Sequence, residues 1–262
     1  MVTLYLSGEP QELLPFDGSA VLHNHFFDQE FTREAFDFLS EETPWEQPEI
    51  VMFGKKHKQS CLSTWHSDAG VNYVYSGVER VAHPMNEILS EIRRRCEDAA
   101  GAKFNSVLVN LYRDGRAGMG WHADNEAVNG REPTIASVSL GATRRFDLRH
   151  RQTKQTVKVD LEDGSLLVMS GLSQKCWVHQ IAKIAKPVSP RINLTFRLVK
   201  PVKAVTASAR KAMSLHDSQT LCGMTPTFIK KLNMMQPKQT ANTDSSVAAK
   251  ISAAMTSFAA TE

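Results

Sequence analysis

Two histidines and one aspartate are spaced so that they could hold one metal ion. His122 and Asp124 stand two residues apart in the sequence HAD, so on an extended segment both side chains leave the same face. His179, in the sequence CWVHQ, supplies a second imidazole. Two histidines and one carboxylate form the facial triad that leaves coordination positions open on non-haem Fe(II). HxD also occurs by chance, and a histidine in an apolar strand can be a hydrogen-bonded core residue, so both interpretations stay open.

A polar strand face follows in the sequence RINLTFR, residues 191–197. Strand alternation places apolar side chains on one face and four polar side chains on the other. The polar side chains are those of Arg191, Asn193, Thr195 and Arg197. Burying guanidinium groups is costly unless an anionic ligand lies among them, and arginine forms bidentate bonds to carboxylates. The strand therefore predicts a dicarboxylate site. The alternative is a half-exposed strand whose polar face lies in water.

An earlier predicted strand, VLVNLYRDG, carries two neutral hydrogen-bonding groups on one face, Asn110 and Tyr112. Both could hold further oxygens of the same ligand. In the order N-x-Y, HxD, H, RxNxTxR, the sequence resembles the AlkB family of Fe(II)- and 2-oxoglutarate-dependent dioxygenases over about residues 51–199. The resemblance also covers three further stretches: SDAGVNYVYSG (67–77), IASVSLGATRRFDLRHR (135–151) and GSLLVMSG (164–171).

The resemblance implies a double-stranded β-helix with Fe(II) held by His122, Asp124 and His179. It implies that Arg191 pairs with the distal carboxylate of 2-oxoglutarate and that Arg197 lies nearer the metal. The remaining residues of this expected cosubstrate site are Asn110, Tyr112, Asn193 and Thr195.

The implied reaction is oxidative demethylation of N-alkylated bases, 1-methyladenine and 3-methylcytosine, in DNA, with RNA left open as a further substrate. Using O2, it converts 2-oxoglutarate to succinate and CO2 and releases the methyl group as formaldehyde. Few catalytic side chains are needed, because the iron performs the oxidation while the protein binds, orients and excludes water.

A base inside a duplex cannot reach a buried iron, so it must be flipped out and held against aromatic surfaces. Trp65, Tyr73 and Tyr75, together with His122, are candidates to stack on that base. The alternative for each aromatic residue is packing in the core or in a lid.

Two further segments carry implied substrate contacts. VMFGK (51–55) resembles a hairpin of the duplex-repair branch, with Met52 and Phe53 as an apolar wedge and Gly54 permitting a tight turn. Glu126 matches an acidic position expected to contact a base amino group. Asn125 departs from the acidic residue common beside it in repair members, which leaves the base preference open.

These residues require a scaffold of strands braced by helices. A helix is predicted from the Asp28 cap to Pro44, and a second from Pro84 to Gly101. Short strands are then predicted at Ser106–Tyr112, Thr134–Leu140, Thr143–Arg149, Thr156–Leu161, Ser165–Ser170, Cys176–Ile181 and Arg191–Val199. We therefore expect an α+β, mainly β fold: a double-stranded β-helix (jelly roll) braced by N-terminal helices.

The predicted organisation has four parts. Residues 1–50 form an acidic packing segment with a helix, and residues 51–104 a nucleotide-recognition hairpin or lid with a bracing helix. Residues 105–200 form the dioxygenase core. Residues 201–262 are rich in Ala, Ser, Thr, Lys and Met, which predicts a basic disordered tail with no assigned function.

Composition bounds the classes of function. The chain has 262 residues, 42% of them hydrophobic and 23% charged, enough for a substantial core. The net charge is +3, but residues 1–50 carry −10 and the remainder +13, which favours a nucleic-acid partner. The four cysteines form no CxxC pair, which argues against a cysteine zinc site.

No apolar run approaches the ~18 residues of a membrane helix, and residues 1–16 lack the pattern of a signal peptide. We expect an intracellular monomer without a membrane partner, nuclear in a eukaryote and cytoplasmic in a bacterium. Two alternatives to DNA repair remain: an RNA or protein demethylase or hydroxylase using the same iron site, and a non-catalytic nucleic-acid-binding jelly roll. Strand preference, preferred base, organism and oligomeric state are not determined by the sequence.

Overall fold

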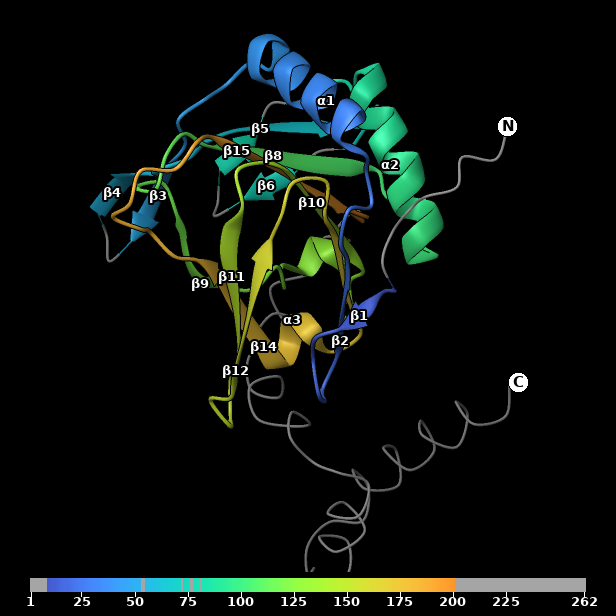
Figure 1. Cartoon of the computed structure of the whole chain (residues 1–262), viewed down its shortest axis with the longest axis vertical. Coiled ribbons are helices and arrows are strands. Elements are labelled where there is room, and N and C mark those ends of the chain that lie inside the picture. Colours follow the sequence, from blue (N-terminus) through green and yellow to red (C-terminus); the bar gives the residue numbers. More distant parts are fainter. Residues whose placement is uncertain (1–8, 53–54, 72, 76–77, 81, 201–262) are drawn as a thin grey trace, which may run out of the picture. The chain divides into compact units, whose positions relative to one another are not determined.

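The computed structural model describes residues 9–52, 55–71, 73–75, 78–80 and 82–200. Two antiparallel sheets dominate this part of the chain (Figure 1). The larger has the strand order β1 (Gln11–Glu12), β2 (Ser19–His23), β13 (Leu166–Ser170), β10 (Ile135–Gly141), β15 (Arg191–Arg197), β8 (Ser106–Tyr112) and β5 (Leu62–Ser67). The smaller has the order β12 (Thr156–Leu161), β11 (Arg144–His150), β14 (Trp177–Ile181) and β9 (Met119–His122).

The chain passes repeatedly from one sheet to the other after β10: β11 and β12 lie in the smaller sheet, β13 returns to the larger, and β14 and β15 repeat the exchange. This exchange produces the predicted jelly roll, with the mainly β composition expected from the sequence. Two short hairpins complete the strands, β3 (Glu49–Met52) with β4 (Lys55–Lys58) and β6 (Tyr73–Tyr75) with β7 (Val78–Arg80).

Helices α1 (Gln29–Glu42) and α2 (Glu87–Ala100) cover the outer face of the larger sheet (Figure 1). Their buried side chains, among them Leu39 and Ile92, form one core with the apolar face of β15. The polar face of β15 is thereby directed between the two sheets, as its alternation predicts.

Both predicted helices are present, and capping residues set their ends. The Asp28 side chain accepts a hydrogen bond from the Phe31 amide at 2.9 Å, as expected for the cap of α1. Helix α2 begins later than predicted: Asn86 caps it by accepting from the Leu89 amide, so Pro84 lies before the helix. Gly101 ends α2 in the left-handed conformation with φ 58°.

The seven predicted strands agree with the observed bounds to within two residues, whereas the sequence analysis gave no bounds for β1, β2, β5 and β9. Cys176 ends the short helix α3 (Ser173–Cys176) instead of beginning β14. Strand β2, which the sequence did not predict, pairs with β13, so part of the acidic N-terminal segment belongs to the larger sheet. Within the described residues, no helix is both long and apolar enough to span a membrane.

Candidate metal centre and anion pocket

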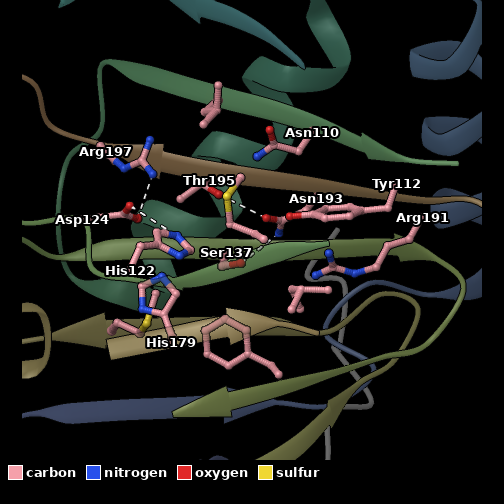
Figure 2. A pocket seen from close by; sticks show the side chains of 15 residues that line it. Asn110, Tyr112, His122, Asp124, Ser137, His179, Arg191, Asn193, Thr195 and Arg197 are labelled. Carbon is pink, nitrogen blue, oxygen red and sulfur yellow. Dashed lines mark hydrogen bonds and ion pairs between the residues drawn. The ribbon is translucent and has the colours of Figure 1, made fainter. Parts of the chain in front are cut away.

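The three predicted metal ligands meet in a pocket between the sheets (Figure 2). His122 at the end of β9 is the direct strand partner of His179 on β14, and their ring centroids lie 4.3 Å apart. Asp124 follows β9, with Oδ1 4.0 Å from His122 Nε2. One ligand atom from each residue lies within 4.8 Å of those of the other two. This spacing suits a single ion bound by two imidazoles and one carboxylate.

The surroundings hold two of these residues in their metal-binding protonation states. Burial acts to raise the pKa of Asp124, but the charges of Arg197, His179 and His122 and the hydrogen bond from Arg197 together outweigh burial and hold the pKa well below its ordinary value. Arg197 Nη2 donates to Asp124 Oδ2 at 2.7 Å. Burial, together with the charge of His122, lowers the pKa of His179 to about 3. At neutral pH the site therefore presents a carboxylate and a neutral imidazole, both ready to bind a cation.

Two further contacts orient the ligands. His122 Nδ1 lies 2.7 Å from the Gly120 carbonyl oxygen, which can only accept, so Nδ1 carries the proton and Nε2 is available. The Asp124 amide donates to Gln174 Oε1 at 3.0 Å. Gln174 lies on α3 and is buried, and the sequence analysis did not identify it because a single glutamine carries no motif.

Arg191 lies toward the other end of the same pocket, beside Tyr112 (Figure 2). Its side chain is 1% exposed, and Nη2 donates to Ser139 Oγ at 2.9 Å. Nε and Nη1 are buried with no hydrogen-bond partner among the described residues. Burial lowers the pKa of Arg191 to about 10, which still leaves the group charged at neutral pH. A buried cation with unused donors fits an anionic occupant such as a carboxylate.

Polar residues of three strands line the space between Arg191 and the triad. Among them are three more residues that the sequence analysis predicted for the cosubstrate site: Asn110, Asn193 and Thr195. Asn193 Nδ2 donates to Ser137 Oγ and to the Val138 carbonyl oxygen, each at 2.9 Å. Ser137 and Ser139 on β10 were not predicted, although the alternation in IASVSLG places both on one face.

Two of the predicted base contacts, Glu126 and Trp65, have side chains that the structure describes. Glu126 precedes the short helix η1 (Ala127–Asn129), and its Oε2 accepts from Asn129 Nδ2 at 2.9 Å. Burial, and secondarily the charge of Asp124, raises the pKa of Glu126. Trp65 is 1% exposed and packs with Leu108 and Val199, and it is not among the residues that line the pocket.

The side chains of the other predicted contacts lie outside what the structure describes. Phe53 and Gly54 are not among the described residues. For Met52, Tyr73 and Tyr75 only the backbone strands are described, with Met52 opposite Lys55 in the β3–β4 pair. The wedge and stacking roles of these residues stay predictions.

Comparison with known proteins agrees with this pocket. Residues 19–197 match the model of the 2OG-Fe(II) oxygenase superfamily. The chain is 34% identical to bovine (Bos taurus) "Alpha-ketoglutarate-dependent dioxygenase alkB homolog 3" over 186 residues, 67% of this chain and 64% of the relative. It is 36% identical to mouse (Mus musculus) "DNA oxidative demethylase ALKBH2" over 162 residues, 59% of this chain and 68% of the relative.

A solved structure titled "The structure of OsALKBH1" shares the fold, with a TM-score of 0.50 at 20% identity, covering 68% of this chain and 97% of that chain. The chain covers 64%, 60% and 61% of the length of the first three curated relatives.

Proposed function

The chain belongs to the AlkB family within the 2OG-Fe(II) oxygenase superfamily, and we propose that it is an oxidative demethylase of N-alkylated bases in DNA. One observation carries the proposal: a His-Asp-His triad shares one pocket with a buried arginine, two of whose donors are unused among the described residues. The curated relatives whose printed names include DNA oxidative demethylase support DNA as the substrate class.

The residues present fit Fe(II) and 2-oxoglutarate. His122 Nε2, a neutral His179 and the Asp124 carboxylate would hold the metal, since this donor set is that of the facial triad. Arg191 would bind the distal carboxylate of 2-oxoglutarate with its guanidinium, of which Nε and Nη1 have no hydrogen-bond partner among the described residues. When bound with O2, the metal and cosubstrate supply the oxidation that yields succinate and CO2 and releases an N-methyl group as formaldehyde.

The protein's own part is binding, orientation and exclusion of water. Arg197 holds Oδ2 of Asp124, which leaves Oδ1 directed toward His122. Glu126 lies close to Asp124 in sequence, and its partly buried carboxyl group would face the amino group of a flipped base. We propose 1-methyladenine and 3-methylcytosine as the bases, and an intracellular monomer, nuclear in a eukaryote, as the acting form.

The test is incubation of the chain with Fe(II), 2-oxoglutarate and oligonucleotides containing 1-methyladenine or 3-methylcytosine. The oligonucleotides are single-stranded DNA, duplex DNA and RNA, and mass spectrometry measures repaired base, formaldehyde and succinate. We expect formaldehyde in proportion to repaired base with DNA. Turnover on methylated RNA alone would favour an RNA demethylase, and failure to convert 2-oxoglutarate with any substrate would favour a binding protein without turnover.

A further inference from the structure

Two loops connect the anion pocket to the metal triad. The first loop, residues 113–118, joins β8 to β9, and the second loop, residues 182–190, joins β14 to β15. Each loop has a pocket residue at one end and a triad strand at the other: Tyr112 and His122 for the first loop, Arg191 and His179 for the second. The relative position of the two loops therefore influences both ends of the site.

The two loops are in direct backbone contact. The Ile184 amide donates to the Gly115 carbonyl oxygen at 2.8 Å. A Cβ added at Gly115 would lie 2.6 Å from the Ile184 carbonyl oxygen and 2.8 Å from that of Lys186. Any side chain at Gly115 would therefore push the loops apart.

A buried arginine donates hydrogen bonds to both loops. Arg144, on β11, is 2% exposed. Its Nη2 donates to the Ala117 carbonyl oxygen of the first loop at 2.9 Å and to the Ala182 carbonyl oxygen of the second at 2.8 Å. Nη1 donates to the Asp114 carbonyl oxygen at 3.3 Å. One planar guanidinium thus bridges both loops, which an ammonium group on a flexible stem cannot reproduce.

Arg144 also lies near the anion pocket. Its Cζ is 5.8 Å from the centroid of the Tyr112 ring, and Arg191 Cζ is 5.3 Å from the same centroid. Arg144 is nevertheless not a pocket-lining residue. It can therefore act on bound groups only indirectly, through the loops, through Tyr112 and through its charge, which Arg191 senses.

We propose that Arg144 is a positioning residue, which bridges the two loops and so sets the distance between the cosubstrate end and the metal end of the site. The proposal rests on the proposed function, because it assumes that a metal and 2-oxoglutarate occupy that site. Residues that orient the groups around a metal typically change its affinity by roughly ten- to a hundredfold when they are replaced.

The adjacent Arg145 provides a matched control. It lies on the same strand but is exposed, with Nε donating to Asp160 Oδ1 at 3.2 Å on the surface. Substitution of Arg145 removes the same charge without touching the loops.

The experiment compares the unmodified full-length chain with Arg144→Met, Arg144→Lys and Arg145→Met. Binding of Mn(II) is followed by electron paramagnetic resonance of the free ion. Anaerobic binding of 2-oxoglutarate to the Fe(II)-loaded protein is followed by visible absorbance, and a melting curve is recorded for each variant. We expect Arg144→Met to weaken both affinities by roughly ten- to a hundredfold, Arg144→Lys to recover neither fully, and Arg145→Met to bind like the unmodified chain.

Gly115→Ala is a second variant that separates the loops without removing charge, and it keeps the inference testable where Arg144→Met does not fold. We expect it to weaken both affinities as well. Equal affinities in Arg144→Met and Arg145→Met would overturn the inference, as would full recovery by Arg144→Lys, which would show that charge alone matters. Failure of the unmodified chain to bind either Mn(II) or 2-oxoglutarate would overturn the proposed function, and this inference with it.

Discussion

At the scale of single residues, the site depends on charges that are buried in pairs or left for a ligand. Asp124 is buried but compensated by Arg197 at 2.7 Å, whereas Arg191 is buried with two nitrogen donors unused among the described residues. An uncompensated buried charge is costly, so a buried arginine such as Arg191 is expected where a ligand supplies the missing partner.

Replacement of a triad residue should remove the metal. Asp124→Ala or His179→Ala deletes one of three ligands, so the iron content per chain should fall to background and demethylation should stop. Metal analysis after desalting measures this. Asp160→Ala, which removes an exposed carboxylate on β12, is the control and should retain iron. Normal iron content in His179→Ala would exclude that residue from the metal centre.

Replacement of Arg191 should act on the cosubstrate. Arg191→Ala should raise the KM for 2-oxoglutarate by about thirtyfold or more, since loss of a buried bidentate partner costs roughly 2–5 kcal/mol. Arg191→Lys should restore only part of the affinity, because an ammonium cannot form the planar fork. Steady-state kinetics measure both effects, with the surface variant Arg94→Ala as a control. An unchanged KM in Arg191→Ala would refute the assignment.

At the scale of elements, caps and turns place the helices and strands that carry the site. Helix α1 packs on the larger sheet opposite the pocket. Asp28→Ala removes the acceptor of the Phe31 amide and should lower the free energy of unfolding by about 1 kcal/mol. Asp37→Ala, within the same helix and exposed, should change it by less than about 0.5 kcal/mol. Urea unfolding curves compare the two, and equal losses would mean that the cap contributes nothing specific.

The β3–β4 hairpin carries the prediction about strand form, which rests on the sequence. Changing Met52 and Phe53 to Ala should depress repair of methylated duplex DNA much more than repair of the same base in a single strand. An inserted apolar side chain recovers part of the cost of unstacking, and a single strand incurs no such cost.

Repair kinetics on duplex and single-stranded DNA, with a melting curve for each variant, distinguish a wedge role of Met52 and Phe53 from a packing role. If the two side chains only pack the hairpin onto the protein, both substrates should suffer equally and stability should fall by roughly 3–5 kcal/mol for a buried Phe. Equal losses on both strand forms would end the wedge proposal.

At the scale of the whole molecule, the composition beyond residue 200 predicts a segment without a core of its own. Limited proteolysis of the full-length chain should therefore cut first at the lysines and arginines beyond Pro201, and mass spectrometry should find a persistent fragment ending near Lys200. The opposite pattern, with early cuts between β8 and β15, would mean that the jelly roll is the less stable part.

Much of the site could be predicted because strand alternation is a local property. The RINLTFR pattern predicted which side chains share the polar face of β15, and HAD predicted that His122 and Asp124 act together. The cap of α1 was likewise predicted from Asp28, because a cap bonds within its own first turn.

The tertiary structure alone decided which distant segments meet. Sheet register pairs His122 with His179, and loop packing brings Gln174 to the Asp124 amide and Arg144 to the carbonyls of two loops. It also placed Trp65 in a buried cluster. Periodicity reports the direction of a side chain relative to its own strand, whereas its partners depend on which strands become neighbours and how the two sheets pack. The sequence by itself therefore determined the chemical groups and their faces, and the packing of the sheets determined their contacts.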